Sequence, residues 1–392
     1  MEQPVQLEQM LKIKASQKRF TLGLPSPQND RRPLVLITPE GVSMLAAHGI
    51  DVRIEKGLGD SIHYDDMRYS RAGATVVNRS EAFRCDVVVY AGRMTPDEAS
   101  CMQPQSILLT MIHNRPPLAD TVRTFVQRRI TVVALDRVRD FRGKYPLADI
   151  MGEVSGRAAV IVAASIMADP SFGKGILPGG VAGVNPCEVV ILGTGMAALA
   201  AARSSIGLGG MVRLFDSDPY CLRTAMAELG PAVIGSALHP VVLGHALAAA
   251  DVIIATRLQR GFAVDESVLD SMKAGVIIID VDDHDGISKS FPSLRCVDVT
   301  DFRNRGLEPG RNLCLTNPVG AVPRTTSMAL TNDVLPIIER LFTAGRGLTN
   351  VLKTDAGLRN AVLVYQGRVV NREMAENVSV KYIDISLLLS FS

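Results

Sequence analysis

The chain of 392 residues lacks tryptophan and has few aromatic side chains, which make up 5% of it. Its charges nearly balance, because 42 lysines and arginines face 40 aspartates and glutamates and no block of one sign occurs. Proteins that bind nucleic acid usually carry a basic patch and aromatic platforms for the bases. We therefore expect no nucleic-acid partner and no electrostatic attachment to a membrane. The hydrophobic content of 47% instead indicates a globular protein with a large core.

Cysteine and histidine are also scarce. The six cysteines are scattered and form no CxxC pair, a spacing typical of zinc sites and redox motifs. In a chain of this length, such scattering argues against a disulfide framework, so we expect reduced and mostly buried thiols. The six histidines show no HxxxH spacing, and no metal site is predicted. The cysteines are Cys85, Cys101, Cys187, Cys221, Cys296 and Cys314.

Signals for secretion or membrane insertion are absent from the sequence pattern. No basic segment followed by an apolar stretch opens the chain, as a secretory signal would require. The longest uninterrupted apolar runs, such as Ala158–Ala164, are well short of the ~20 residues that span a bilayer. We therefore expect a cytoplasmic protein without a membrane partner.

The most informative segment is Glu188–Asp216, in which an apolar run, a GxGxxA turn, a helix and a second apolar run lead to an acid. Gly193 permits the sharp turn, Gly195 leaves room for a pyrophosphate, and Ala198 lets helix and strand pack closely. Free N–H groups and the helix dipole favour phosphate at this turn. Asp216 can accept hydrogen bonds from ribose hydroxyls, which favours NAD over NADP. The turn residues expected to contact the dinucleotide are Gly193, Thr194, Gly195, Met196 and Ala197.

Strand-like and helix-like periods alternate on both sides of this segment. We therefore predict an α/β protein of two Rossmann-like, doubly wound parallel-sheet domains. The predicted strands are Phe20–Leu24, Asp51–Ile54, Val87–Tyr90, Ile107–Ile112, Thr131–Leu135, Val189–Leu192, Val252–Ala255 and Val276–Asp280. The predicted helices are Val42–His48, Tyr64–Arg71, Leu118–Arg129, Glu153–Ala168, Cys221–Leu229, Val241–Ala249, Asp265–Met272 with Asp265 as N-cap, and Ser327–Ala344.

Six segments carry a resemblance to a known family. They are LVLITPEGV (34–42), MGEVSGR (151–157), GKGILPGGVAGVNPCEVVILGTG (173–195), FDSD (215–218), KAGVIIIDVDDHDG (273–286) and NPVGAVPRTTSMALTNDVLP (317–336). Over roughly residues 20–390, the sequence resembles alanine dehydrogenase and the related NAD-binding subunit of proton-translocating transhydrogenase. The last segment, together with His113, favours the alanine dehydrogenase branch.

The resemblance implies a substrate domain made of residues 1–147 and 326–392, an NAD(H)-binding Rossmann domain of residues 148–325, and a cleft between them. It also implies a homo-oligomer, from dimer to hexamer, and Asn317 as a further cofactor contact. The implied reaction converts L-alanine, NAD⁺ and water to pyruvate, ammonia and NADH. The partners would be NAD and a small amino or oxo acid.

His113 matches the catalytic histidine of the family, and its usual pKa of about 6.5 suits a general acid or base. Other family positions differ. The carboxylate-binding arginine aligns with Leu34, and Arg31 and Arg32 lie just before it. In place of the family's lysine motif, Arg93 is the nearby cation, able to bind a carboxylate but not to release a proton near neutral pH.

The family's aspartate position holds His284, so either this histidine or a neighbouring acid such as Asp283 is a further catalytic candidate. These departures keep two alternatives open. One is an NAD(H)-binding protein without dehydrogenase activity, used as a redox sensor or partner subunit. The other is a related dehydrogenase with a bulkier amino-acid substrate, similar to the saccharopine and carboxyethyl-ornithine enzymes.

Overall fold

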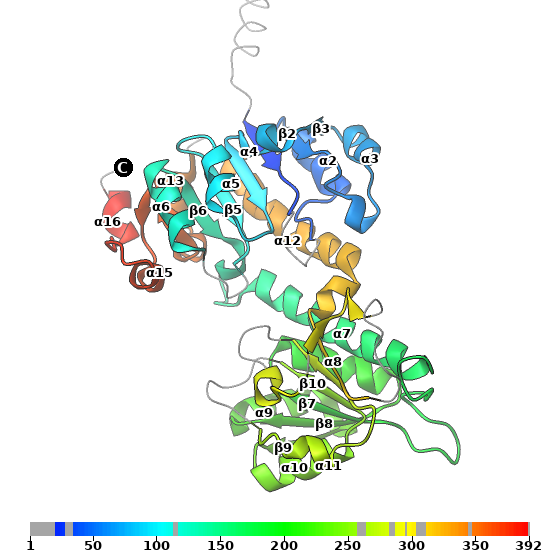
Figure 1. The fold of residues 1–392 in the computed structure, drawn as a ribbon. Coiled ribbons are helices and arrows are strands. Elements are labelled where there is room, and N and C mark those ends of the chain that lie inside the picture. Colours follow the sequence, from blue (N-terminus) through cyan, green and yellow to red (C-terminus); the bar gives the residue numbers. More distant parts are fainter. Residues whose placement is uncertain are drawn as a thin grey trace, which may run out of the picture. The chain divides into compact units, whose positions relative to one another are not determined.

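The computed structural model describes residues 20–27, 34–112, 117–256, 264–281, 287–294, 296–302, 311–343 and 347–390. The described residues divide into two compact units. Unit 1 contains residues from both ends of the chain, 20–27, 34–147 and 327–390, and unit 2 is the intervening stretch, 148–326. Unit 1 therefore combines blue and cyan elements with orange and red ones in Figure 1, whereas unit 2 is mainly green and yellow.

Unit 1 has an eight-stranded sheet with the order β15-β14-β6-β5-β4-β1-β2-β3. Strands β1 to β6 pair in parallel, and β14 and β15 extend one edge in antiparallel fashion. Parallel neighbours need long crossovers, which the intervening helices supply. The strands are β1 (Thr21–Leu24), β2 (Asp51–Glu55), β3 (Thr75–Val77), β4 (Val87–Tyr90), β5 (Ile107–Thr110), β6 (Thr131–Ala134), β14 (Val362–Tyr365) and β15 (Arg368–Val369).

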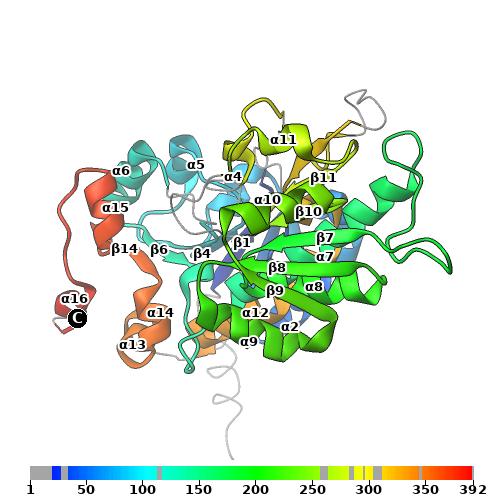
Figure 2. The same ribbon diagram turned by 90° about the horizontal axis from the view of Figure 1, so that it is seen from below.

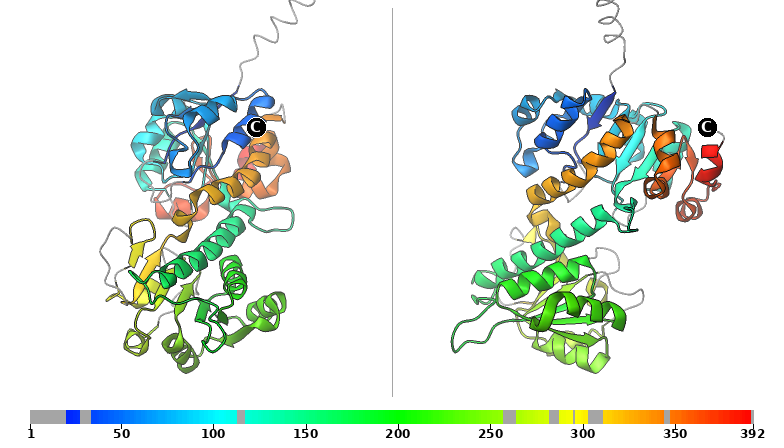
Figure 3. Two further views of the ribbon diagram at one scale, coloured as in Figure 1. Left: turned by 90° about the vertical axis from the view of Figure 1, so that its right-hand side faces the viewer. Right: turned by 180° about the vertical axis from the view of Figure 1, so that it is seen from behind.

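The helices of unit 1 bury apolar residues against this sheet. Val88 of β4 and Leu108 of β5, for example, share one core with Val122 and Phe125 of α6. The helices are α2 (Pro39–Ala47), η1 (Asp60–Ile62), α3 (Asp66–Arg71), α4 (Arg79–Phe83), α5 (Pro96–Cys101), α6 (Ala119–Gln127), η2 (Leu135–Arg137), α13 (Gly347–Thr354), α14 (Ala356–Asn360), α15 (Arg372–Asn377) and α16 (Ile385–Ser390). Two long helices, α7 (Pro146–Ala168) and α12 (Pro323–Thr343), contain the junctions between the units and are teal and orange in Figure 3.

Unit 2 has a seven-stranded, all-parallel sheet with the order β12-β13-β11-β10-β7-β8-β9. Figure 2 shows β7, β8 and β9 side by side. The strands are β7 (Glu188–Leu192), β8 (Met211–Asp216), β9 (Val233–Ala237), β10 (Val252–Ala255), β11 (Ile277–Asp280), β12 (Cys296–Asp298) and β13 (Leu313–Thr316). The helices are α8 (Met196–Gly207), α9 (Pro219–Leu229), η3 (Gly230–Ala232), α10 (Pro240–Ala249), α11 (Val268–Ser271), η4 (Ile287–Ser290) and η6 (Pro318–Ala321).

Both faces of the unit 2 sheet are covered. Ile191 of β7 packs in one core with Ala198 of α8, whereas its neighbour Val190 packs in another with Leu247 of α10. Successive strand residues point to opposite faces, so a strand buried on both sides is apolar throughout. The predicted α/β class, with two doubly wound and mainly parallel sheets, is confirmed; the predicted cleft between the domains stays a prediction.

Helix α7 is longer and more apolar than the uninterrupted runs of the sequence indicate. The helix runs for 23 residues, and its most apolar 18-residue window has a mean hydropathy of 1.5, enough by length and composition to span a membrane. The expectation rested on uninterrupted apolar runs, but a long helix tolerates scattered polar residues and keeps a high mean hydropathy. Most of that window is buried, and Ala159, Ala163 and Ile166 lie in the core of unit 2. A core helix of this kind is weak evidence for a membrane span.

The predicted helix Asp265–Met272 is largely wrong. The helix α11 covers Val268–Ser271, and its N-cap is Ser267. The side chain of Asp265 instead accepts a hydrogen bond from the backbone N–H of Ser267 at 2.9 Å, which stabilises the preceding turn. A short aspartate side chain that bonds its own backbone favours a turn as readily as a helix start.

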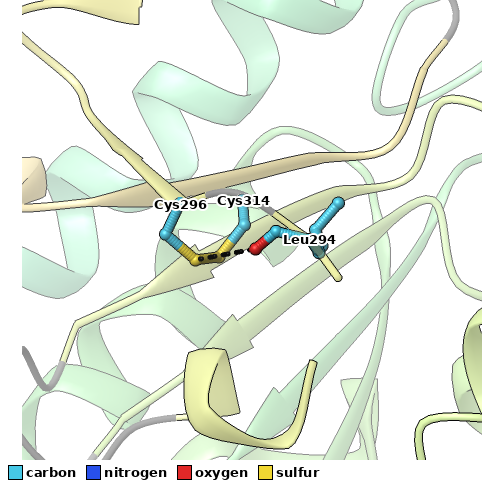
Figure 4. Close-up of a disulfide and its surroundings, with 3 residues drawn as sticks. All are labelled: Leu294, Cys296 and Cys314. Atoms are coloured by element: carbon cyan, nitrogen blue, oxygen red, sulfur yellow. Dashed lines mark hydrogen bonds between the residues drawn. A yellow bond between two sulfur atoms is a disulfide. The ribbon is translucent and has the colours of Figure 1, made fainter. Parts of the chain in front are cut away.

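The prediction that all cysteines are reduced is also wrong. Cys296 and Cys314 form a disulfide, with 4.5 Å between their Cα atoms (Figure 4). They lie 18 residues apart in sequence but directly opposite each other on the parallel strands β12 and β13. Sheet register, which no local spacing reveals, therefore brings them together. Of the free cysteines, Cys85 and Cys187 are buried, whereas Cys101 and Cys221 are exposed.

Candidate functional site

The candidate site lies at the carboxyl edge of the unit 2 sheet, where the strand order reverses between β7 and β10. From β7 the chain continues to β8 on one side, and from β10 it continues to β11 on the other. Open α/β sheets bind ligands at such a switch point. Gly193 and Thr256 follow the two strands there, and Thr256 ties them together. Its backbone N–H and its hydroxyl donate to the carbonyl oxygen of Leu192 at 3.0 Å and 2.8 Å.

The glycine turn between β7 and α8 leaves open space. Gly193 has a φ of 99°, which favours glycine, and its N–H donates to the carbonyl oxygen of Phe215 at 2.8 Å. A Cβ built on Gly195 meets no heavy atom within 4 Å. Gly195 is the N-cap of α8, and within the described chain no side chain caps this helix and no acid lies in its first turn. The first N–H groups and the positive end of the helix dipole are therefore available to an anion.

Helix α8 packs closely on α7 behind this turn. A Cβ on Gly156 of α7 would stand 2.0 Å from the carbonyl oxygen of Ala197, a distance that the fold excludes. A Cβ on Gly152, one turn earlier, would make a tight but less restrictive contact, at 3.3 Å from the backbone N of Ala197 and from the Cβ of Met196. Ala198 is fully buried, as the sequence pattern predicts for a residue between helix and strand. The MGEVSGR segment thus supplies the glycines that let α8 start at this place.

Asp216 ends β8, and its carboxylate is held from two sides. The hydroxyl of Thr194 donates to one oxygen at 2.6 Å, and the backbone N–H of Asp218 donates to the other at 2.9 Å. The glycine turn and the acid are therefore parts of one arrangement. Asp218 has a different task, because it caps α9; the backbone N–H of Tyr220 and the thiol of Cys221 lower the pKa of its carboxyl.

Asn317 lies directly after β13 at the same edge. It adopts the left-handed region with a φ of 57°, and it is 5% exposed. Its side-chain N–H donates to Asp298 of β12 at 3.0 Å, and the N–H of Gly320 donates to its backbone carbonyl at 3.0 Å. The other oxygen of Asp298 accepts from the N–H and hydroxyl of Thr300. Sequence reasoning missed Asp298, because it gains its partner through strand pairing.

Together these features fit a dinucleotide. The open space at Gly195 and the uncapped start of α8 suit a pyrophosphate, and the oriented carboxylate of Asp216 suits ribose hydroxyls. The described residues contain no group of three histidine, cysteine, aspartate or glutamate side chains arranged to hold a metal ion.

The equivalent edge of unit 1 carries a network of ion pairs. At its switch point, between β1 and β4, Arg79 donates to Glu55 at 2.8 Å, to Glu98, and to the carbonyl oxygen of Ser26 at 2.8 Å. The hydroxyl of Tyr90 donates to Glu98 at 3.0 Å. Burial raises the pKa of Tyr90, with the Glu98 charge adding to it, so the phenol keeps its proton. Burial opposes the charge of Arg79, but Glu55, Tyr90 and Glu98 together outweigh it and raise the pKa of the guanidinium.

Sequence reasoning missed this ionic network. One local signal was present, because Thr95 and Glu98 form a capping box at the start of α5. That signal explains the position of Glu98 but not its ion pair with Arg79, which is 19 residues away in the sequence.

The predicted catalytic residues are only partly described. Arg93 is exposed in the loop between β4 and α5, at the carboxyl edge of the unit 1 sheet. His113, Asp283 and His284 lie outside the described residues. Ile112, just before His113, is buried, and its N–H donates to Asp136 at 3.0 Å. Arg31 and Arg32 are also outside the described residues, and Leu34, which aligns in sequence with the family's arginine, is 1% exposed and lies in the core.

Comparisons with known proteins agree with this architecture. The model of the alanine dehydrogenase/PNT N-terminal domain matches residues 26–155, and that of the C-terminal domain matches residues 159–372. The alanine dehydrogenase of Bacillus subtilis is 29% identical over 370 residues, which cover 92% of this chain and 96% of that protein. The alanine dehydrogenase of Mycolicibacterium smegmatis is 28% identical over 385 residues, covering 94% of this chain and all of that protein.

A solved structure of an L-alanine dehydrogenase superimposes with a TM-score of 0.78 at 28% identity, covering 91% of this chain and 98% of its own. Sequence models and fold thus agree over both units, and the chain belongs to the alanine dehydrogenase/PNT family.

Proposed function

We propose that this protein is an alanine-dehydrogenase-like oxidoreductase, which catalyses the NAD-dependent oxidative deamination of L-alanine or a related small amino acid and the reverse reductive amination of a 2-oxo acid. The observation that carries the proposal is the open glycine turn joined through Thr194 to Asp216 at the unit 2 switch point. Membership of the alanine dehydrogenase/PNT family supports the same reaction class.

The dinucleotide would be held by unit 2. Backbone groups of Gly193, Gly195 and the first turn of α8 would bind the pyrophosphate, and Asp216 would bind the ribose and disfavour the extra phosphate of NADP. Asn317, at the end of β13, would contact the nicotinamide half. The bound cofactor supplies the hydride acceptor, and the protein supplies orientation and proton transfer.

Unit 1 would hold the amino or oxo acid. His113 would act as the general acid and base, since an imidazole titrates near neutral pH. Arg93 would bind the substrate carboxylate as an always-charged fork. Asp283 or His284 would assist from unit 2. This proposal assigns unit 1 as the substrate domain and unit 2 as the NAD(H) domain.

The protein would act in the cytoplasm as a homo-oligomer, from dimer to hexamer. The loop before β7 supports self-association, because its apolar residues Leu177, Val181 and Val184 are each more than half exposed. Apolar side chains that gather on an exposed loop are typical of interaction surfaces.

Leu34 favours a second candidate function. A buried leucine at the family's arginine position removes a charge-assisted grip on the substrate carboxylate, worth about 1.5–3 kcal/mol. A protein that kept the dinucleotide site but lost this grip would bind NAD(H) without turnover, or would accept a bulkier amino acid that another residue recognises.

The test is the loss of NADH absorbance at 340 nm with ammonia and a panel of 2-oxo acids, pyruvate first. Binding of NADH is followed in parallel by its own fluorescence, because the chain has no tryptophan to act as an energy donor. Turnover with pyruvate that is abolished by His113→Ala, with NADH binding intact, supports the proposal. Binding without turnover on any acid would instead favour the NAD(H)-binding protein.

A further inference from the structure

The disulfide between Cys296 and Cys314 joins the edge strand of the unit 2 sheet to its inner neighbour. Among the described residues, strand β12 pairs only with β13, through three residue pairs, whereas β13 also pairs with β11. The two sulfurs therefore add a covalent tie to a short strand that otherwise depends on few hydrogen bonds (Figure 4). Edge strands held by so few pairs open more readily than central ones.

The two sulfurs differ in access. Cys296 is partly exposed on the edge strand, whereas Cys314 is 2% exposed on the inner strand. An incoming thiolate can therefore attack the Sγ of Cys296, with Cys314 as the leaving group. The Sγ of Cys296 lies 3.8 Å from the carbonyl oxygen of Leu294, so a reduced thiol has an acceptor in place. The site therefore suits both redox states.

The disulfide lies close to a residue of the proposed cofactor site. Asp298 follows Cys296 by two residues, Asn317 follows Cys314 by three, and the side chains of Asp298 and Asn317 are hydrogen-bonded at 3.0 Å. The strained left-handed backbone of Asn317 needs support from its surroundings. When the disulfide is formed, it helps β12 to hold Asp298 against Asn317. When the disulfide is reduced, only the three β12–β13 residue pairs and the hydrogen bond between Asp298 and Asn317 keep these two residues together.

We propose that Cys296 and Cys314 form a reversible thiol–disulfide modification site, which sets the position of Asn317 and thereby the affinity for the dinucleotide. The reagents are low-molecular-weight thiols and disulfides. In reduction, a thiolate attacks Cys296, the S–S bond breaks, and Cys314 leaves as a thiolate and takes up a proton; a second thiol then releases the mixed disulfide from Cys296. In oxidation, the two protein thiols lose two electrons to a small disulfide, which becomes two thiols.

The site itself is tested by counting thiols after equilibration in glutathione buffers and denaturation. The oxidised protein should show four reactive thiols, and the reduced protein all six. Six thiols at every ratio of oxidised to reduced glutathione would overturn the site. This measurement does not depend on cofactor binding, so it stands even if the proposed function fails.

The coupling rests on the proposed function and is tested by NADH fluorescence titration. Loss of support for one hydrogen-bonded contact predicts about fivefold weaker binding by the reduced protein. The double variant Cys296→Ser/Cys314→Val should bind NADH like the reduced protein, and dithiothreitol should not change its affinity. The single variant Cys296→Ser should behave in the same way, although it retains the core residue Cys314. The control Cys101→Ser/Cys221→Ser, which removes exposed free thiols, should keep the response.

Three outcomes are separable. Equal NADH affinity in both redox states would overturn the coupling and leave dinucleotide binding intact. A response that disappears in the Cys101/Cys221 control would assign the effect to other thiols and also overturn the coupling. Absence of NADH binding in both states would overturn the proposed function, whereas the thiol count would still decide the modification site.

Discussion

The carboxyl edges of the two sheets differ in what occupies them, although both sheets reverse their strand order at an equivalent place. In unit 1, the switch point between β1 and β4 is filled by Arg79 and two buried carboxylates. In unit 2, the switch point between β7 and β10 carries a glycine turn, open space at Gly195 and an uncapped helix.

Both sheets have a topological switch point that could hold a ligand, but the side chains at that point determine whether any space is left for one. Glycine at the turn of unit 2 removes the side chain that would occupy the space next to the helix N-terminus. In unit 1, the buried carboxylates bring in a guanidinium, because a buried charge without a partner is strongly unfavourable. The switch point of unit 2 can take an anion between strand and helix, whereas the switch point of unit 1 is occupied by the protein's own ion pairs.

The largest expected effect comes from opening the ionic network of unit 1. Arg79→Met removes the guanidinium that pairs with two buried carboxylates, those of Glu55 and Glu98, and should lower the free energy of unfolding by about 3 kcal/mol. Urea unfolding followed by circular dichroism measures this. The control Arg123→Met removes the exposed pair with Asp120 and should change stability by less than about 1 kcal/mol. Equal effects of the two variants would mean that the network is no stronger than a surface pair.

The next effect concerns the acid at the open edge of unit 2. Asp216→Asn removes the carboxylate proposed to bind the ribose, and should weaken NADH binding about ten- to a hundredfold, with a smaller change for NADPH. Fluorescence titration with both cofactors measures the ratio. Asp218→Asn, two residues away, affects the cap of α9 and should leave NADH affinity unchanged. A loss of NADH binding in the Asp218 variant alone would place the ribose contact there.

Alanine substitutions at Gly195 and Gly156 compare an open glycine position with a closely packed one. Gly195→Ala meets no protein atom and should keep the melting temperature, but lower NADH affinity by about tenfold because the methyl group enters the pyrophosphate space. Gly156→Ala meets the carbonyl oxygen of Ala197 and should destabilise the protein by about 1–3 kcal/mol. Thermal melts and NADH titrations on both variants check the contrast. Unchanged affinity in Gly195→Ala would exclude close backbone approach of the cofactor.

The smallest expected effect concerns Asp251, which lies at the edge of the unit 2 sheet opposite to the candidate site. Asp251 bonds Lys174 at 3.3 Å, Lys273 at 3.1 Å and the N–H of Glu188 at 3.1 Å. Burial alone would raise the pKa of Asp251, but the N–H of Glu188 and the lysines outweigh it and lower the pKa. A lowered pKa stabilises the fold above the usual aspartate value of about 3.9, and this stabilisation is lost as the pH falls through the folded-state pKa.

Asp251→Asn should therefore destabilise the protein by about 1–2 kcal/mol at pH 7. The difference from the unaltered protein should close as the pH falls below about 4. Unfolding in urea across this pH range measures it. Asp270→Asn removes an exposed charge of the same sign and serves as the control. A difference that stays constant with pH would assign the effect of Asp251→Asn to packing.

Local sequence patterns were sufficient for several elements. The strands Val87–Tyr90 and Val252–Ala255 lie where the apolar runs predicted them, and β7, α8 and β8 follow the predicted order. Other elements were missed or mistaken. The strands β12 and β13 were not predicted, because they are short and take their stability from neighbours in the sheet. The helix α11 is much shorter than predicted, because the side chain of Asp265 accepts a hydrogen bond from the N–H of Ser267 and stabilises a turn before the helix.

The sequence by itself determined the two-sheet α/β architecture, the glycine turn and the acid at Asp216, because these depend on residues close together in the chain. Tertiary structure decided the network around Arg79, the disulfide of Cys296 and Cys314, and the bond between Asp298 and Asn317. Each of these joins residues from different strands or loops. Their partners are chosen by sheet order and register, which arise from the packing of the whole unit and leave no fixed spacing in the sequence.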